Sequence, residues 1–320
     1  MNPIRVLAGA TAMELGAFAA LSAGAGLGGL RNGWLDVVNS FAPIILGTGI
    51  LAGGLAYWSL EGATRSWVIC LALISIAYGL ALTAPEVVKL LVPGSSGRTQ
   101  YRVLSANVWS ANPSPDLAVK KIIEQDADAV FMQEAEGTIY GNLEQLKSHY
   151  PFSSNCAGSG VKIFVKTPIV AQGCGLASQA DKTLPLAWVR TLALDGRPIT
   201  LVTTHFGWPF PPLLQQAQRV QLSARVHQLS TDDMILGGDF NTTPWSFAMK
   251  QQDKLLKPLT RRTIAWFSWP ARLDALQQPW AIPILPIDHV YAGLNWKSVR
   301  LARLRIPGSD HFATEAFLTR

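Results

Sequence analysis

Charged residues are scarce in this chain of 320 residues: they make up 15% of it, against about 25% in an ordinary soluble domain. The scarcity is concentrated in residues 1–99, which hold only five of the 27 Lys and Arg and four of the 21 Asp and Glu. The remaining residues therefore carry 22 basic and 17 acidic groups, a mild net charge of +5. That balance suits an anionic substrate or a phospholipid surface without requiring either.

Cysteine is also rare, with Cys70 in an apolar run and Cys156 and Cys174 further along. These spacings give no metal-ligand pattern and no disulfide framework. Cys156 and Cys174 would pair if this part of the chain lies outside the cytoplasm, and two unpaired thiols fit the sequence at least as well. The chain also lacks internal repeats and low-complexity segments, which argues against a repeat architecture.

Three apolar spans, at about residues 6–30, 37–58 and 67–84, fill the charge-poor third. Each approaches the roughly 20 residues that a helix needs to cross the hydrocarbon core of a bilayer. A signal peptide would explain only the first span, so we predict an anchor of three transmembrane helices over residues 1–93 and a linker at 94–100. Three spans place the amino terminus and the rest of the chain on opposite sides, and the distribution of Lys and Arg does not choose the orientation.

Small residues recur every four positions along the first span. This pattern predicts one helix face on which another helix packs closely. The alternative is a general richness in alanine and glycine. The residues of the stripe are Ala8, Ala12, Gly16, Ala20, Gly24 and Gly28.

From residue 101 onward, strand-length apolar runs alternate with helical patterns. The runs at 161–165 and 169–175 are interpreted as paired strands, and Asp195-Gly196 is typical of a hairpin turn. Mixed strands alternating with helices predict a layered α/β domain over residues 101–320 with sheet at its core. We expect strands at 101–108, 129–132, 161–165, 169–175, 188–194, 199–204, 235–238, 287–292, 299–304 and 312–318, and helices at 114–125, 142–149, 213–229 and near 246–251.

The most informative stretch runs from Met234 to Trp245, where a short apolar run ends in Gly-Gly-Asp-Phe-Asn. Asp239 and Asn241 are two residues apart in an extended backbone, so their side chains share a face. A carboxylate and an amide beside two glycines can bind a phosphate, a metal ion or a water molecule. The alternative is an Asx-turn in which both side chains bond only the local backbone.

Other predicted strands are also followed by polar residues, at the end where sites in α/β sheets usually lie. A single such residue would mean little, but a series of them predicts a shared site. The series consists of Asn107, Glu134, His205, Asp239, Asn241, Asp288, Asp310 and His311.

These residues lie in six ordered motifs that resemble the endonuclease/exonuclease/phosphatase superfamily, which includes DNase I-like nucleases, sphingomyelinases and inositol phosphatases. The resemblance covers residues 100–320 and implies a four-layer α/β/β/α sandwich. Together with the three spans, it is greatest for a membrane-anchored bacterial branch similar to the teicoplanin-resistance protein VanJ and to YafD. The motifs are Ser105-Ala-Asn-Val-Trp, Gln133-Glu134, Thr204-His205-Phe206, Gly238-Asp-Phe-Asn, Ile287-Asp-His-Val and Gly308-Ser-Asp-His.

The acids and amides of the set suggest a site for Mg²⁺ or Mn²⁺, which prefer oxygen ligands and bridge to phosphate oxygens. Glu134 is the expected metal ligand, Asn107 completes or orients its shell, and Asp310 joins the metal or its waters.

Acid–base chemistry is expected from His311, because imidazole titrates near neutral pH without help. The resemblance implies that Asp288 holds and polarises this ring. Asp239 would align and deprotonate the attacking water, while Asn241 and His205 would donate hydrogen bonds to the charge developing on phosphorus. His289, the neighbour of Asp288, is expected to point away and pack.

We therefore expect a metal-dependent phosphoesterase that acts on a lipid-linked phosphate or pyrophosphate. The resemblance suggests undecaprenyl pyrophosphate as the substrate, the bacterial inner membrane as the location and an extracytoplasmic catalytic domain. A membrane-bound nuclease acting on nucleic acid and a sphingomyelinase-like phospholipase are the alternatives. A non-catalytic binding module would not be expected to retain the whole set.

Overall fold

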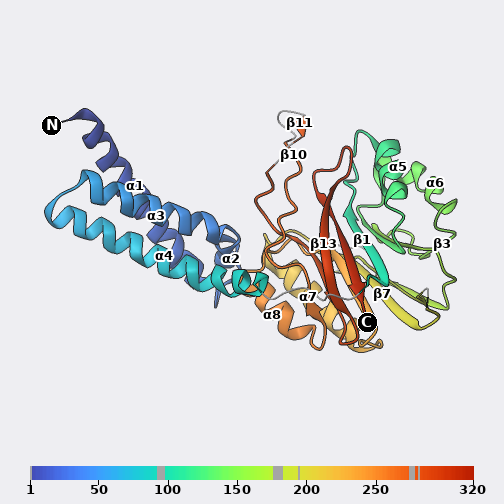
Figure 1. Cartoon of the computed structure of the whole chain (residues 1–320). Helices are drawn as coiled ribbons and strands as arrows, with labels where there is room; N and C mark the ends of the chain where they lie inside the picture. The colour runs from blue at the N-terminus through green and yellow to red at the C-terminus, as the bar shows by residue number, and fades with distance from the viewer. Residues whose placement is uncertain (1, 92–97, 176–182, 194, 274–277, 280–281) are drawn as a thin grey trace. The chain divides into compact units, whose positions relative to one another are not determined.

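The computed structural model describes residues 2–91, 98–175, 183–193, 195–273, 278–279 and 282–320 (Figure 1). The chain forms two compact units. The first comprises Met1–Val92 and Thr243–Lys250, and the second comprises Pro93–Thr242 and Gln251–Arg320. Most of the predicted linker lies outside the described residues.

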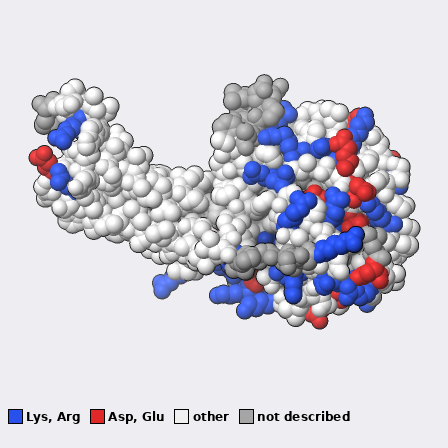
Figure 2. Space-filling view, viewed as in Figure 1, with Lys and Arg blue, Asp and Glu red and all other residues white. Residues whose placement is uncertain are grey.

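The first unit is built on three long helices, each long and apolar enough to cross a membrane. The face of this unit seen in Figure 2 is mostly white, with few charged residues. Large apolar side chains are exposed, for example Leu21 at 75% and Trp67 at 69%. Exposed apolar surface on this scale is typical of a face that meets lipid or protein. Its helices are α1 (Pro3–Gly28), α2 (Gly33–Asp36), the 3₁₀ helix η1 (Val37–Phe41), α3 (Ala42–Ser59) and α4 (Gly62–Leu90).

The buried face of α1 differs from the predicted stripe. Ala12 and Gly16 are buried as expected, but Gly24 is exposed. Steps of four residues drift by about 40° per turn around a helix, whereas alternating steps of three and four stay on one face. The buried residues follow the second pattern: Gly9, Ala12, Gly16, Ala19, Ala23 and Gly26.

The second unit contains two six-stranded sheets that pack face to face. The first has the strand order β13-β14-β1-β2-β4-β3 and the second β5-β6-β7-β8-β12-β9. The first sheet consists of β1 (Tyr101–Asn107), β2 (Ala129–Gln133), β3 (Phe152–Ser153), β4 (Val161–Val165), β13 (Lys297–Arg305) and β14 (Phe312–Thr319). The second consists of β5 (Ala171–Gly175), β6 (Leu186–Leu192), β7 (Pro198–His205), β8 (Met234–Asp239), β9 (Thr260–Arg261) and β12 (Asp288–Ala292).

Helices cover the outer faces of the two sheets. Ala118, Val119 and Ile122 of α5 belong to a core cluster with the outer residues of the first sheet. Between the sheets, Phe131 and Ile163 meet Leu201 and other inward residues of the second sheet in a separate core. The layers form the predicted DNase I-like sandwich. The remaining elements are α5 (Pro115–Gln125), η2 (Gly137–Asn142), α6 (Glu144–Lys147), α7 (Pro212–His227), α8 (Phe247–Leu255), and the short pair β10 (Arg272–Leu273) and β11 (Gln278–Pro279).

The predicted pairing of residues 161–165 with 169–175 is wrong. β4 pairs with β2 and β3, whereas β5 pairs with β6 in the other sheet. Between them the chain crosses from one sheet to the other, and there Thr167 Oγ1 lies 2.8 Å from Thr191 Oγ1 and donates to the carbonyl of Leu192. Apolar alternation reports that a strand has a buried face but not which neighbour it pairs with.

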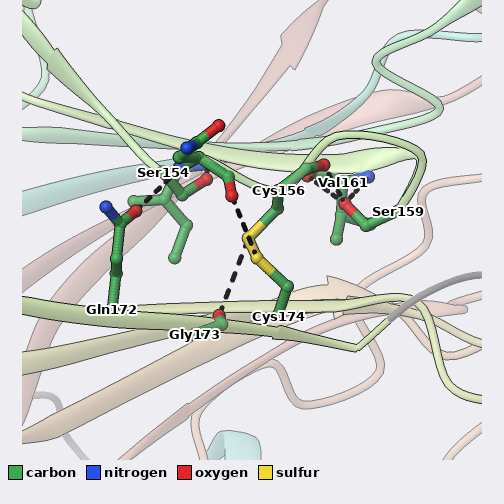
Figure 3. The surroundings of a disulfide bond; sticks show 9 residues. Ser154, Cys156, Ser159, Val161, Gln172, Gly173 and Cys174 are labelled. Carbon is green, nitrogen blue, oxygen red and sulfur yellow. Dashed lines mark hydrogen bonds between the residues drawn. A yellow bond between two sulfur atoms is a disulfide. The ribbon is translucent and has the colours of Figure 1, made fainter.

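A disulfide also links the two sheets (Figure 3). Cys156, in the loop between β3 and β4, is bonded to Cys174 of β5, with their Cα atoms 5.5 Å apart. Cys156 is buried and Cys174 is exposed. The bond therefore joins the edge of the first sheet to the edge strand of the second, and of the two alternatives left open by the sequence, the paired one holds.

Candidate active site

Three site residues of the second sheet are brought together by strand register. In the parallel pair β7–β8, His205 lies opposite Asp239, and in the antiparallel pair β8–β12, Asp288 lies opposite Asp239. The carboxyl end of β8 thus meets the amino end of β12. Three residues separated by up to 83 positions become neighbours on adjacent strands.

The first sheet contributes from the facing side. Asn107 ends β1, and its Nδ2 donates to Glu134 Oε1 at 3.0 Å and to Asp239 Oδ2 at 3.1 Å. Its Oδ1 accepts from the amide of Trp109 at 3.0 Å. Asn107 therefore joins carboxylates from both sheets, and in this orientation its amide positions Glu134.

His311 is held between two carboxylates. Its Nδ1 lies 2.9 Å from Asp288 Oδ2, and its Nε2 lies 3.6 Å from Asp239 Oδ2. Burial favours the neutral ring, but Asp288 and then Asp239 outweigh it and raise the pKa of His311 to about 10. At neutral pH the ring is an imidazolium that is ready to donate a proton or a hydrogen bond.

Asp239 stands at the centre of the site and is only 1% exposed. Burial, followed by repulsion from Asp288, raises the pKa of Asp239 to about 6, against the opposing effect of the two histidines. His205 Nε2 also lies 3.6 Å from Asp239 Oδ2, too long for a hydrogen bond. Asp239 is therefore ionised at neutral pH, with a pKa closer to neutrality than that of an ordinary aspartate.

Each oxygen of Asp239 has a different environment. Oδ1 accepts from the backbone amide of Asn241 at 2.8 Å, which is the Asx-turn considered for this stretch, while Oδ2 faces Asn107 and the two histidines. Asn241 has a left-handed backbone (φ 47°), and its Nδ2 donates to the carbonyl of Phe206 at 2.8 Å. Asp239 thus forms the Asx-turn through Oδ1, while its Oδ2 remains directed toward the other site residues.

Glu134 and Asp310 carry the remaining carboxylates. Burial alone would raise the pKa of Glu134, but the Ser110 amide, nearby His205 and Asn107 hold it below its usual range. The pKa of Asp310 is raised by burial. Its Oδ2 accepts from Trp269 Nε1 at 3.2 Å, while its Oδ1 is buried with no hydrogen-bond partner among the described residues.

A buried carboxylate oxygen without a partner is costly unless something binds it. Asp310 Oδ1 and the ionised Glu134 are hard oxygen donors, so the predicted set fits a divalent cation. Asp239, Asp288 and His311 also place one potential ligand atom each within 4.8 Å of one another. The 2.9 Å contact between Asp288 and His311 is that of a hydrogen bond, which favours the acid–base role for these three.

Sequence reasoning missed the residues that support these loops. Gln215 of α7 donates from Nε2 to the carbonyls of Gly207, Phe240 and Asn241. Ser309 Oγ donates to the carbonyl of Asn107 at 2.7 Å and accepts from the amide of His311 at 3.0 Å. The one available signal was spacing: Gln215 lies seven residues, about two helical turns, before Leu222, which places both on the buried face of α7. Gln215 is only 2% exposed there.

His289 is buried as expected. Its Nε2 donates to the carbonyl of Thr242 at 2.9 Å, and its Nδ1 therefore accepts from Thr263 Oγ1 at 3.1 Å. The ring is a neutral support for the backbone that follows Asn241.

Comparison with known proteins places this geometry in context. The profile of the Endonuclease/Exonuclease/phosphatase family matches residues 104–311, which span all six motifs. The chain belongs to this family. No curated protein sequence matches the chain.

Solved structures of the same fold are distant in sequence from this family member. Beta toxin from Staphylococcus aureus is 16% identical with a TM-score of 0.52, covering 68% of this chain and 99% of the toxin. An endonuclease/exonuclease/phosphatase from Beutenbergia cavernae is 17% identical with a TM-score of 0.53, covering 69% and 72%. TDP2 from D. rerio, complexed with a single-strand DNA product, is 14% identical with a TM-score of 0.53, covering 69% and 99%.

Proposed function

We propose that the protein is a metal-dependent phosphoesterase, anchored in a membrane, that hydrolyses a lipid-linked phosphate or pyrophosphate. The observation that carries the proposal is the convergence of Glu134, Asp239 and His311 at one site in a chain that also has three membrane-length helices. Neither feature alone selects a lipid substrate. Together they favour an enzyme that needs to stay close to headgroups.

A Mg²⁺ or Mn²⁺ ion held by Glu134 and Asp310, with Asn107 in its shell, would supply Lewis-acid stabilisation of negative charge on the phosphoryl oxygens. Divalent metal use in this fold is supported by a beta toxin structure with bound magnesium ions, 16% identical with a TM-score of 0.51 and covering 68% of this chain and 99% of the toxin.

The chain's own residues then divide the proton chemistry. Asp239 is ionised at neutral pH and accepts a proton from the attacking water, which it also aligns. The imidazolium of His311, kept charged by Asp288, donates to a phosphoryl oxygen as negative charge develops there. His205 and the remaining N–H of Asn241 act as further donors to the same oxygens.

The extracytoplasmic side of a bacterial inner membrane is the proposed location. Disulfides persist in oxidising compartments and are rare in the cytoplasm, so the bond between Cys156 and Cys174 favours the outside for the catalytic domain. A lipid pyrophosphate carrier such as undecaprenyl pyrophosphate would be within reach on that side.

The test uses the full-length protein purified in detergent, with Mg²⁺ and undecaprenyl pyrophosphate. We expect phosphate release that is abolished by EDTA and reduced at least about a hundredfold in Glu134→Ala. Glu136→Ala is the matched control, because Glu136 is an exposed acid two residues away. No release from this lipid or from related prenyl phosphates would refute the lipid substrate, and activity surviving in Glu134→Ala would refute the metal assignment.

A nuclease or a phospholipase of the sphingomyelinase type is the second candidate. It is supported by fold neighbours that include beta toxin and TDP2 with its DNA product. Nicking of plasmid DNA, or release of phosphocholine from sphingomyelin, that is lost in Glu134→Ala and retained in Glu136→Ala would favour it over the lipid-linked phosphate.

A further inference from the structure

A layer of polar side chains lies between the two sheets, one step below the candidate active site. Inward-facing residues alternate along a strand, so Ser105 and Thr203 are the inward residues that precede Asn107 and His205. The inward positions one step further from the site are apolar and belong to the core between the sheets. The polar layer therefore separates that core from the catalytic groups. Its buried members are Ser105 of β1, Gln133 of β2, Thr203 of β7 and Thr314 of β14.

Gln133 connects the two sheets within this layer. Its Nε2 donates to Thr203 Oγ1 at 2.8 Å and lies 3.4 Å from Ser105 Oγ. Gln133 belongs to the first sheet and Thr203 to the second, so the shorter bond crosses the space between the sheets. Both side chains are fully buried, and water does not compete for the bond. The bond therefore ties β2 to β7 just below the site.

The hydrogen-bonding capacity of this layer is only partly used within the protein. Gln133 Oε1 and Thr314 Oγ1 are buried with no hydrogen-bond partner among the described residues. Burying polar atoms in this way costs folding free energy. A bonded pair of buried polar side chains can also be replaced by apolar side chains of the same shape with little loss of stability. Stability alone therefore does not explain why Gln133 and Thr203 occupy these positions.

Gln133 is also the last residue of β2, immediately before the predicted metal ligand Glu134. Glu134 has a left-handed backbone (φ 53°), an uncommon conformation for a residue with a side chain, which surrounding contacts must maintain. Its Oε2 accepts from the amide of Ser110 at 2.9 Å. On the other sheet, Thr203 lies two residues before His205, the last residue of β7. The bond between Gln133 and Thr203 thus joins the strand that leads into Glu134 to the strand that ends in His205.

We propose that Gln133 is a positioning residue for the active site. Through its bond to Thr203 it sets the separation of the two sheets just below the catalytic groups, and so places Glu134 relative to Asp239 of the second sheet. Asn107 makes the corresponding connection one step higher, through its bond to Asp239 Oδ2. The inference rests on the proposed function only for the metal that Glu134 binds.

Magnesium binding to the full-length protein in detergent, measured by calorimetry, tests the positioning without turnover. Gln133→Met combined with Thr203→Val replaces both partners by apolar side chains of similar shape, so the melting temperature Tm should change little. The Kd for Mg²⁺ should nevertheless rise about tenfold, because Glu134 is no longer held in place relative to the second sheet. A role in stability alone predicts instead that Mg²⁺ affinity follows Tm. A wild-type Kd in a double variant of unchanged Tm would overturn the inference.

Two single variants separate the bond from the layer as a whole. Thr203→Ser keeps the hydroxyl that accepts from Gln133 and should keep the wild-type Kd. Thr314→Val removes a hydroxyl of the same layer that makes no hydrogen bond to the described residues, and it should also keep the wild-type Kd. Tenfold weaker Mg²⁺ binding in Thr314→Val would assign the effect to the whole layer and overturn the specific role of Gln133.

A further comparison covers the case in which the double variant does not fold. Thr203→Val alone deprives Gln133 Nε2 of its short bond, whereas Thr203→Ser does not. We expect Thr203→Val to bind Mg²⁺ more weakly than Thr203→Ser, and equal Kd values in these two variants would count against the positioning role.

Hydrogen exchange decides the positioning even if no metal binds. The amide of Ser110 donates to Glu134, so its exchange rate reports whether Glu134 keeps its place. In the double variant we expect this amide to exchange about tenfold faster, while amides of β12 keep their wild-type rates. Wild-type exchange at Ser110 would overturn the inference. If the wild-type protein binds no Mg²⁺ and releases no phosphate, the proposed function fails, while exchange at Ser110 still decides whether Gln133 positions Glu134.

Discussion

Two buried histidines near β12 show how surroundings decide what an imidazole can do. His311 is 4% exposed and His289 is 1% exposed. His311 has carboxylates near both ring nitrogens, and its pKa is raised. His289 has a carbonyl and a hydroxyl, and burial lowers its pKa to about 4. At neutral pH the His311 ring is therefore charged and the His289 ring is neutral. Asp288 is hydrogen-bonded to His311, whereas it is only the sequence neighbour of His289.

The difference teaches that burial alone does not decide the charge of a histidine. Desolvation acts on both rings in the same direction, toward the neutral form. Only the carboxylates of Asp288 and Asp239, which lie beside the His311 ring, reverse this effect. The two ring nitrogens of His289 instead form hydrogen bonds with the carbonyl of Thr242 and the hydroxyl of Thr263.

The largest expected effect is a difference in kcat between two variants in which His311 or His289 is replaced by glutamine. His311→Gln should lower kcat by about 10² to 10⁴, because it removes a charged proton donor from the reacting centre. His289→Gln keeps an N–H for the carbonyl of Thr242 and should lower kcat less than about tenfold. Phosphate release by the two variants, measured at equal folded concentration, checks the contrast. Equal losses would remove the distinction between the two histidines.

The second expected effect is a stability difference that depends on pH. The folded-state pKa of His289, about 4, lies below its unfolded value of 6.5, so the unfolded chain binds the proton first as the pH falls. Stability from this group is therefore present above pH 6.5 and declines toward pH 4, by on the order of 3 kcal/mol.

Denaturant unfolding followed by tryptophan fluorescence, at pH 7 and pH 4.5, measures this decline. In His289→Gln, which does not titrate, the loss between the two pH values should be smaller by most of that amount. A variant that loses as much stability as the wild type would show that other groups cause the decline.

The smallest expected effect concerns the partner of His311. Asp288→Asn keeps the shape but removes the charge that raises the pKa of His311, so that pKa should fall toward its usual range. Because the imidazolium is the required form, the alkaline limb of the kcat–pH profile should move to lower pH, with about a tenfold loss of kcat at neutral pH. An unmoved limb would mean that another group controls it.

Much of this site could be predicted from sequence because its chemistry sits in short motifs. Asn107, Glu134, His205 and Asp239 each end or follow a strand, and local patterns show where strands end. The convergence of these ends follows from ordinary packing of α/β sheets. The sandwich was predictable for the same reason together with the family resemblance.

The parts that sequence could not provide are long-range. The separation of β4 and β5 into different sheets has no local signature, because the residues of a strand do not show which strand it pairs with. The support that Gln215 gives to three carbonyls depends on loops that α7 meets only in the folded protein. Asp36 accepts hydrogen bonds from the amides of Phe247 and Ala248 in α8, more than 200 positions further along the chain. The local sequence shows Asp36 only as an acid at the edge of an apolar span.

Gly237 on β8 sets how near the two halves of the site can come. A Cβ added there would lie 2.9 Å from the Phe131 ring of β2 in the facing sheet. Any larger residue at this position would therefore force the Phe131 ring, or the strand that carries it, to move. The absent side chain of Gly237 thus lets the two sheets approach closely, two residues before Asp239.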